Sequence, residues 1–364
     1  MVNLFEPLKK ILIINPFGIG DVLFTTPLIR EIKQAYPGCS IGYWCNERVQ
    51  SILKNNPCID KIFGLSRGDI KKIFLKSRLK GIGKSWDLLR KIKKEKFDIS
   101  FDFSLDHRYG LISKLAGIKK RIGFNYKNRG RFLTDKIDID YYSTKHVVEY
   151  YLDLLKIINI IPKSRNLEIG VPEDYKIKAK NILSNIGIKD TDIIVGIAPG
   201  GGLSWGKDAS LKHWPAVKFA ELADKIITNF GTKILILGDE SEKHIVDTIV
   251  NTMNNKAIDL VGKTGLQELI AIISNLRLLI TNDGGPLHIA VALGKKTVSF
   301  FGPVDPKVYG PYPPDENRHI VLRKTLDCSP CYRKFRLSPC KRNRECLKMI
   351  DVKLALEAVT RLLH

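Results

Sequence analysis

The sequence predicts an α/β protein built from two doubly wound domains, and three observations support this prediction. Short β-branched apolar runs alternate with helical patterns, as expected for repeated βα units. The alternation occurs once in each half of the chain, and a polar segment with two prolines at 160–172 separates the halves. A length of 364 residues also suits two domains of about 150 residues each. We therefore expect an N-terminal domain over 1–165 and a C-terminal domain over 166–348.

The apolar runs place the expected strands and helices. Strands of the first half are expected at 10–15, 40–45, 61–65, 98–103 and 121–124. A helix over 22–36 follows the first strand and ends at Pro37-Gly38, a pair that terminates helices. Strands of the second half are expected at 193–198, 233–237, 258–261, 278–281 and 297–301, with helices at 216–229, 242–251, 266–274 and 287–293. A last helix, within 349–364, has an apolar face.

The chain is strongly basic, with 60 Lys and Arg against 38 Asp and Glu, a net charge of +22 at pH 7. Such an excess favours polyanions: nucleic acid, anionic lipid or phosphorylated substrates. Two segments, 67–96 and 119–131, concentrate the basic residues and predict either a membrane-facing surface or an ordinary solvated one. No run approaches the ~18 apolar residues of a membrane-spanning helix. Because the N-terminus also lacks a signal-peptide pattern, we expect a cytoplasmic location.

The first candidate site is the turn Gly18-Ile19-Gly20-Asp21, which follows a strand and opens a helix. Its two glycines allow the backbone to approach a ligand, and the helix start offers unpaired N–H groups. A dinucleotide fingerprint would need a third glycine at Leu23, so a dehydrogenase is not predicted. Asp21 is expected either to face a ligand at the carboxyl end of the strand or to cap the helix.

Two further glycine-rich turns follow strands of the second half. Gly200–Gly202 precede Lys212, which suits phosphate as a point charge, although a flexible loop with a surface lysine fits equally well. The other turn, Asp283-Gly284-Gly285-Pro286-Leu287-His288, opens a helix whose first amides could hold a diphosphate. Asp283 could accept a hydrogen bond from a sugar hydroxyl. His288 is expected either to donate to phosphate or to be structural.

Glu240 lies in Gly238-Asp239-Glu240-Ser241-Glu242, directly after a strand. An acid at such a place binds ribose hydroxyls in other doubly wound domains. The same residues also suit a capping box that opens the next helix. Both interpretations stay open at this point.

Four of the seven cysteines lie close together in the sequence: Cys328, Cys331, Cys340 and Cys346. In a cytosolic chain such a group favours a structural zinc site over disulfides. The spacing is irregular for a zinc ribbon, so paired or free, packed thiols are the alternatives.

Taken together, these motifs resemble glycosyltransferase family 9, the ADP-heptose:lipopolysaccharide heptosyltransferases. The pieces that match, in the order of the family, are Gly18-Ile-Gly-Asp21, Thr26-Pro27, Tyr36-Pro37, Pro199-Gly200, Lys212-His213-Trp214-Pro215, Asp283-Gly-Gly-Pro-Leu-His288 and the cysteine-rich segment 328–346. They span the chain from about residue 10 to 350. Two departures stand out: Asn15-Pro16-Phe17 replaces a frequent arginine, and Gly284 replaces a frequent hydroxyl residue.

The resemblance implies a GT-B fold, in which two Rossmann-like domains face each other across a cleft. It implies inverting, metal-independent sugar transfer from a nucleotide diphosphate, with zinc at most structural. Asp21 would be the general base, and Lys212 would contact the donor phosphate. The turn from Asp283 to His288 would hold the donor sugar and diphosphate. The helix within 349–364 would pack back on the N-terminal domain.

The implied acceptor is an anionic glycolipid such as the lipopolysaccharide core. The basic segments 67–96 and 119–131 would then hold a monomeric enzyme at the inner face of the cytoplasmic membrane, and the segment 160–172 would act as a hinge. Alternatives are a family member with another sugar donor, an enzyme like the UDP-sugar 2-epimerases, or a basic nucleic-acid-binding protein. No nucleic-acid recognition motif appears, so nucleic acid is not an expected partner.

Overall fold

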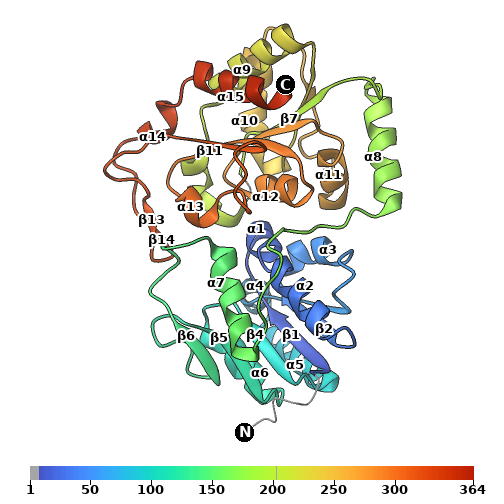
Figure 1. The fold of residues 1–364 in the computed structure, drawn as a ribbon, viewed down its shortest axis with the longest axis vertical. Helices are drawn as coiled ribbons and strands as arrows, with labels where there is room; N and C mark the ends of the chain where they lie inside the picture. The colour runs from blue at the N-terminus through green and yellow to red at the C-terminus, as the bar shows by residue number, and fades with distance from the viewer. Residues whose placement is uncertain (1–7, 202) are drawn as a thin grey trace. The chain divides into compact units, whose positions relative to one another are not determined.

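The structure is a computed structural model that describes residues 8–201 and 203–364. The chain divides after Glu168 into two compact units, close to the boundary expected at residue 165. Each unit contains a six-stranded sheet covered by helices, so the predicted pair of α/β domains is confirmed (Figure 1). Gly202 of the predicted triple-glycine turn lies outside the described residues.

The sheet of the first unit is parallel throughout and has the order β3-β2-β1-β4-β5-β6. Its strands are β1 (Lys10–Ile14), β2 (Ser40–Cys45), β3 (Lys61–Gly64), β4 (Ile99–Asp102), β5 (Lys120–Asn125) and β6 (Asp135–Asp138). The strand order reverses between β1 and β4, and ligands of such sheets bind beyond the carboxyl ends at this switch point. Strand β6 was not predicted, because its Asp-Lys-Ile-Asp sequence at the sheet edge has no apolar run.

The helices of the first unit are α1 (Ile19–Leu23), α2 (Thr26–Ala35), α3 (Gln50–Leu53), α4 (Arg67–Lys76), α5 (Arg78–Glu95), α6 (His107–Leu115) and α7 (Val147–Asp153). The single helix expected over 22–36 is therefore two helices. The hydroxyls of Thr25 and Thr26 donate to the carbonyls of Val22 and Leu23 at 2.6 and 2.7 Å. These bonds end α1 and allow α2 to begin with Pro27 in its first turn.

The sheet of the second unit repeats this topology, with the order β12-β11-β10-β7-β8-β9 and parallel pairing throughout. Its strands are β7 (Ile194–Ala198), β8 (Lys233–Ile236), β9 (Ile258–Asp259), β10 (Leu278–Asn282), β11 (Lys296–Phe301) and β12 (His319–Arg323). Counted from its own first strand, the unit has the same order as the first one. Its switch point lies between β7 and β10.

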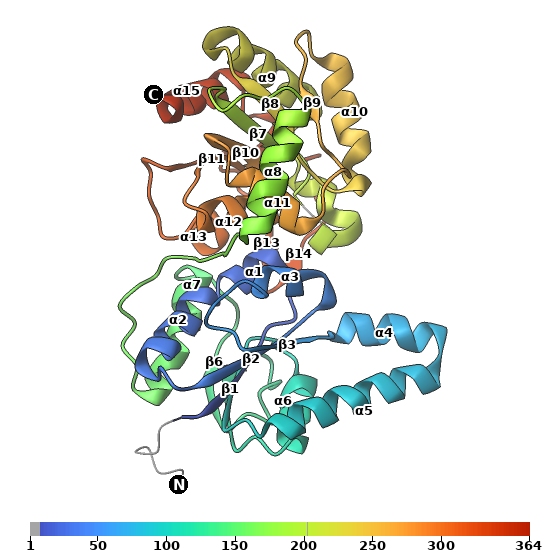
Figure 2. The same ribbon diagram turned by 90° about the vertical axis from the view of Figure 1, so that its right-hand side faces the viewer.

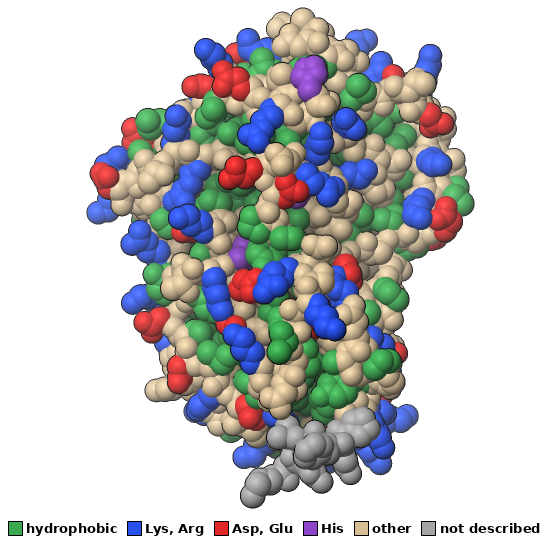
Figure 3. All heavy atoms as spheres, in the orientation of Figure 1, with side chains coloured by type: hydrophobic (Ala, Val, Ile, Leu, Met, Phe, Trp, Pro, Cys, Tyr) green, Lys and Arg blue, Asp and Glu red, His purple; other side chains and the backbone are tan. Residues whose placement is uncertain are grey.

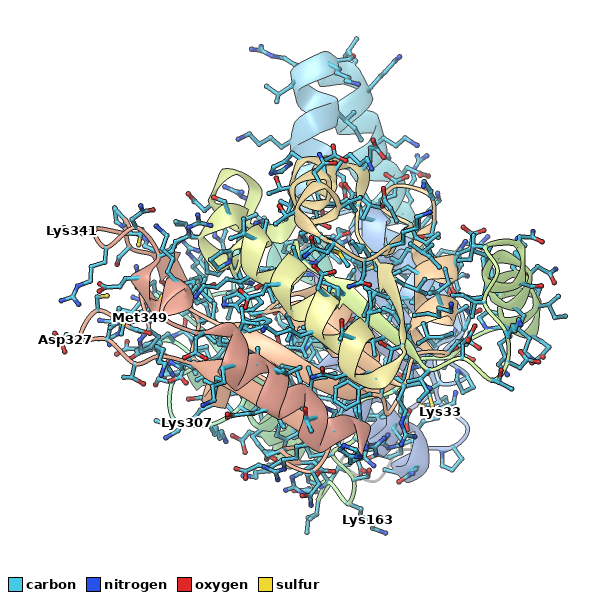
Figure 4. All side chains as sticks on the ribbon, turned by 90° about the horizontal axis from the view of Figure 1, so that it is seen from above. Lys33, Lys163, Lys307, Asp327, Lys341 and Met349 are labelled. Carbon is cyan, nitrogen blue, oxygen red and sulfur yellow. The ribbon has the colours of Figure 1, made fainter. Side chains whose placement is uncertain are left out.

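The helices of the second unit are α8 (Glu173–Asn185), α9 (Ala216–Phe230), α10 (Lys243–Thr252), α11 (Leu266–Ile273), α12 (Gly285–Ala292), α13 (Pro306–Tyr309), α14 (Glu345–Lys348) and α15 (Val352–Leu363). Helix α15 lies beside α9 and also contacts β11 (Figure 4). The prediction that this helix packs on the N-terminal domain is wrong. Its apolar face, which includes Ala355, Val359 and Leu362, is buried in the core of the second unit.

The segment 160–172 contains no helix or strand, as expected for a linker. Its first part is nevertheless fastened to α2. The carboxylate of Glu31 accepts from the backbone N–H groups of Lys163 and Ser164 at 2.9 and 2.8 Å. The hydroxyl of Thr26 accepts from the backbone N–H of Glu168 at 3.0 Å. These bonds make residues 163–168 part of the first unit, and the hinge stays a prediction.

Within the described part of the chain, none of the helices is both long and apolar enough to cross a bilayer.

Candidate active site

Asp21 is the third residue of α1, directly beyond the carboxyl end of β1. Its carboxylate accepts from the backbone N–H of Gly18 at 3.3 Å, so the predicted capping role is confirmed. The side chain is half-buried rather than enclosed. Since a carboxylate has about four lone-pair positions, capping leaves room for a second hydrogen bond. Asp21 can therefore cap the helix and still meet a ligand.

The turn between β1 and α1, with Gly18 and Gly20, is held by two buried asparagines. Asn15 accepts from the N–H of Phe17 at 3.2 Å and donates to the carbonyl of Asp21 at 2.9 Å. Asn46 donates to the carbonyl of Pro16 at 3.2 Å. The departure from arginine in this turn thus brings an internal brace that fixes the start of α1.

Asp102 is a residue of the first unit that the sequence analysis missed. It ends β4 and pairs with Ile14 of β1, so it lies directly at the switch point. Burial raises the pKa of its carboxyl to about 7, although the Ser104 side chain and the Ser104 N–H, 2.8 Å away, partly oppose the shift. A strand-end aspartate could have been noticed, but only its burial distinguishes it from other acids.

Lys212 and Asp283 form a buried ion pair in the second unit, with 2.7 Å between Nζ and Oδ2. Asp283 follows β10, and Lys212 comes from the 3₁₀ segment Leu203–Lys212 that follows β7. The Lys212 ammonium also lies 4.4 Å from the ring centroid of Trp205, which adds a cation–π contact. Lys212 is therefore not the flexible surface lysine that was the alternative in the sequence analysis.

The turns after β7 and β10 touch backbone to backbone. A Cβ atom on Gly284 would lie 2.3 Å from the carbonyl oxygen of Gly201, closer than any real contact. Gly201 itself has φ +128°, a value that favours glycine. The hydroxyl residue that often follows the aspartate in the family has no room here. Gly200 is also closely approached, but by a side chain: a Cβ there would lie 1.7 Å from the Glu242 carboxylate, which would have to move.

Asn282 joins the two turns. Its side-chain amide donates to the carbonyl of Pro199 at 2.5 Å, and its side-chain oxygen accepts from the N–H of Trp214 at 2.9 Å. The segments that carry Gly200, Lys212 and Asp283 are thereby held together, although they are far apart in the sequence.

His288 lies on α12, which begins at Gly285 and has the buried Leu287 in its first turn. Burial lowers the pKa of its imidazole to about 3, and the nearby Lys212 charge lowers it further. The ring is therefore neutral at physiological pH. A neutral imidazole can donate one N–H to a phosphate oxygen and add no charge to the site.

Glu240 is exposed beyond the carboxyl end of β8, between the two residues of a capping box. The box consists of Asp239, which accepts from the N–H of Ser241 at 3.0 Å, and Glu242, which accepts from the N–H of Asp239 at 3.0 Å. The capping role predicted for this segment is confirmed. Asp239 and Glu242 perform it, and Glu240 does not take part. The contact of Glu240 with ribose hydroxyls stays a prediction.

The four clustered cysteines lie in the segment between β12 and α15, at one edge of the unit near Asp327, Lys341 and Met349 (Figure 4). All four are free thiols. Burial, followed by the neighbouring cysteines, raises the pKa of Cys331 to about 11. Across the described residues, no three or more Cys, His, Asp or Glu side chains are placed to hold a metal ion. A structural zinc site at these four cysteines stays a prediction.

The predicted residues thus fall into two groups, one in each unit. Gly18, Gly20 and Asp21 lie beyond β1. Six of the others gather beyond β7 and β10, and Glu240 lies at the end of β8; the six are Gly200, Lys212, Asp283, Gly284, Gly285 and His288. A buried ammonium, a neutral imidazole and a helix start suit an anionic ligand such as a phosphate ester.

Known proteins resemble this chain in sequence and in fold. The family model of glycosyltransferase family 9 (heptosyltransferase) matches residues 85–341. Lipopolysaccharide heptosyltransferase 2 of Salmonella typhimurium is 24% identical over 329 residues, which is 86% of this chain and 88% of that protein. A family 9 glycosyl transferase from Veillonella parvula is 26% identical, with a TM-score of 0.83 over 98% of this chain and 97% of that one. ADP-heptose lps heptosyltransferase II from E. coli is 21% identical, with a TM-score of 0.76 over 97% and 98%.

The solved structures match both units over almost their whole length, which confirms the predicted GT-B architecture of two Rossmann-like domains. The family match covers well over half of the chain, and the curated relative spans most of it. The chain therefore belongs to glycosyltransferase family 9 and is a glycosyltransferase.

Proposed function

We propose that this enzyme transfers a heptose from ADP-heptose to the lipopolysaccharide core or a similar anionic glycolipid, with inversion and without a catalytic metal. The names of its relatives support the sugar and the acceptor. The observation in this chain that carries the donor site is the buried pair of Lys212 and Asp283 beside the start of α12. A desolvated ammonium at a helix N-terminus is well arranged to receive a diphosphate.

The donor diphosphate would compete with Asp283 for the Lys212 ammonium. Once released, the Asp283 carboxylate would accept from a hydroxyl of the donor sugar. As the nucleoside diphosphate leaves, its growing negative charge would be met by Lys212, by the N–H of His288 and by the first amides of α12. Preorganised donors of this kind stabilise developing charge without moving. Glu240 would bind the ribose hydroxyls.

Asp21 would act as the general base. Inversion requires in-line attack of an acceptor hydroxyl on the anomeric carbon, and the hydroxyl proton must leave as the new bond forms. The cap bond from the Gly18 N–H, 3.3 Å away, orients the Asp21 carboxylate for this role. General base catalysis typically contributes about 10²–10⁴-fold.

The acceptor side of the proposal rests on charge. The two basic segments of the first unit, 67–96 and 119–131, would attract an anionic glycolipid and the inner face of the cytoplasmic membrane. Over the face seen in Figure 3, Lys and Arg side chains are instead scattered among acidic and apolar ones. Attachment by charge weakens as salt rises. We expect a monomer that binds no nucleic acid.

The donor can be tested with a panel of ADP-, UDP- and GDP-sugars, scored by release of the nucleoside diphosphate in the presence of lipopolysaccharide core acceptors. Preference for ADP-heptose, with an inverted anomeric product by nuclear magnetic resonance, is expected. Turnover unchanged by excess chelator is expected as well. Preference for another base, or dependence on a divalent ion, would contradict the corresponding part of the proposal.

A different donor sugar is the second candidate, and two observations favour it. Gly284 cannot offer the hydroxyl that the family often has at this position, and the Asn15 brace replaces a frequent arginine. Both changes alter the contacts offered to the sugar or its phosphates. The same donor panel separates the two candidates.

A further inference from the structure

Helices α4 and α5 form a hairpin, turning at Ser77, that extends away from the sheet of the first unit (Figure 2). Only one face of α5 is packed into the unit, through the buried residues Gly81, Leu88 and Ile92. Beyond that face, most residues of α5 are exposed. Its exposed side chains are therefore not explained by the core.

A second apolar face runs along the opposite side of α5. Leu79 is 82% exposed, Ile82 58% and Trp86 56%. They are spaced three and four residues apart, which places them on one stripe of a helix, roughly 100–180° around the helix axis from Gly81 and Leu88. Leu75, at the end of α4, is 78% exposed and lies near the same tip. Single exposed apolar residues are ordinary, but an aligned set marks an interaction surface.

Basic residues flank this apolar stripe. From 66 to 96 the chain has twelve Lys and Arg against three acids. Each acid is engaged nearby: Asp69 in the cap of α4, Asp87 with Lys91 at 2.8 Å, and Glu95 with Lys61 at 2.5 Å. The guanidinium of Arg90 lies 5.6 Å from the Trp86 ring centroid, so a cation and an interface-seeking aromatic occupy the same face.

We propose that the α4–α5 hairpin is a membrane-docking element whose stripe of Leu75, Leu79, Ile82 and Trp86 inserts into an anionic lipid leaflet. The flanking Lys and Arg would contact the lipid headgroups. A helix with exposed large apolar residues on one side and cations beside them is typical of segments that lie in the membrane interface. The net positive charge selects an anionic bilayer over an uncharged one.

This inference deepens the proposed function, because it rests on a membrane-bound acceptor, and it adds a component that charge alone does not provide. Electrostatic attraction is screened at high salt, whereas burial of apolar side chains is not. The inserted stripe therefore predicts binding that persists in part at about 0.5 M salt, where the Debye length is only about 4 Å and attraction between exposed charges is largely screened.

The test is co-sedimentation of the full chain with vesicles of phosphatidylglycerol and phosphatidylethanolamine, in low and high salt. The variant Leu79→Ser/Ile82→Ser/Trp86→Ser should bind roughly tenfold more weakly at high salt, which corresponds to about 1.4 kcal/mol. The matched control is Ile177→Ser, which removes a residue of α8 that is 54% exposed and should change nothing. Equal binding of the triple variant and the wild type would overturn the proposal.

Trp86 offers a direct readout of insertion. Its fluorescence should be quenched by lipids brominated on the acyl chain, and the quenching should vanish in Trp86→Phe, which keeps an apolar ring. Absence of quenching, or complete loss of binding at high salt, would mean attachment by charge alone and would contradict insertion.

Activity separates this inference from the proposed function. Transfer to a deacylated acceptor in solution should be unchanged in the triple variant, which also shows that the variant is folded. If the wild type transfers no sugar to any acceptor yet its stripe inserts, the proposed function fails and the docking surface stands. If sugar transfer occurs but the stripe does not insert, the proposed function stands and the docking surface fails.

Discussion

The two units of this glycosyltransferase have the same strand order but opposite chemistry at their switch points. The first unit presents carboxyl groups, Asp21 beyond β1 and Asp102 at the end of β4. The second unit presents the Lys212 ammonium, held by Asp283, and the neutral ring of His288. The shared topology fixes where a site forms, and the residues decide what it does. One unit is suited to accept a proton and the other to hold an anion.

The same contrast appears in the response to pH. In the first unit, burial raises the pKa of Asp102 to about 7, so the folded state favours its protonated form. In the second unit, burial first and neighbouring cations second lower the pKa of His213 and His319 to about 4. Asp102 should therefore cost the first unit stability as pH rises, and the two imidazoles should cost the second unit stability as pH falls.

Removing Lys212 should have the largest effect. Lys212→Ala leaves the buried Asp283 carboxylate without its cation and the donor diphosphate without its anchor. We expect kcat/KM to fall about 10²–10³-fold and the free energy of unfolding to drop by about 3–5 kcal/mol. Steady-state kinetics and urea unfolding measure both.

Two controls sharpen this prediction. Lys225→Ala removes an exposed lysine of α9 and should be silent. The double variant Lys212→Ala/Asp283→Ala should recover stability, because no unpaired charge remains, but not activity. Full activity in either Lys212 variant would contradict the proposal that Lys212 of the second unit holds the donor diphosphate.

Asp102→Asn should remove the loss of stability that Asp102 causes in the first unit as pH rises. The stability that Asp102 contributes is fully present below its unfolded pKa of about 4 and is lost as pH rises through about 7. The asparagine variant does not titrate, so it should be more stable than the wild type at pH 8 by about 3 kcal/mol and show no such gain at pH 4. Denaturant unfolding at both pH values measures this. If the difference in stability between variant and wild type were the same at pH 4 and pH 8, Asp102 would not titrate as a buried carboxyl.

Gly284→Ser should test the backbone contact in the second unit. The new Cβ would lie 2.3 Å from the carbonyl oxygen of Gly201, so the two turns must separate. We expect a loss of about 1–3 kcal/mol, seen as a lower melting temperature, and weaker donor binding. Gly38→Ser is the matched control, since its Cβ would have nothing within 4 Å. If both variants melt alike, the close approach is not what excludes a hydroxyl residue.

His213→Gln should give the smallest effect, of opposite sign to that of Asp102. The stability linked to the neutral imidazole is present above its unfolded pKa of 6.5 and is lost as pH falls through about 4. The free energy of unfolding of the variant minus that of the wild type should be about 1–2 kcal/mol larger at pH 5 than at pH 7.5. Parallel pH profiles for the two proteins would rule this out.

The sequence predicted the features that are local in the chain. Asp21, Lys212 and the turn from Asp283 to His288 stand beside glycines and strand ends, so their positions follow from a short window of residues. The pairing of Lys212 with Asp283 does not, because it depends on β7 and β10 being neighbours in the sheet.

Other features were beyond prediction for related reasons. Strand β6 has a polar sequence, and its place at the edge of the sheet removes the apolar signal. The partner of α15 is decided by which core has room for its apolar face. The raised pKa of Asp102 depends on burial by residues distant in the chain. The reason for glycine at 284 appears only when the neighbouring turn is present.

The division of labour between the units is tested most directly by Asp21→Asn, with ADP binding by calorimetry measured beside turnover. The account predicts that turnover falls at least about 10²-fold, since the proton has no acceptor, while ADP affinity stays within about twofold, since the proposed ligands for the diphosphate lie in the second unit. Near-normal turnover, or loss of ADP binding together with turnover, would contradict the assignment of base and donor site to different units.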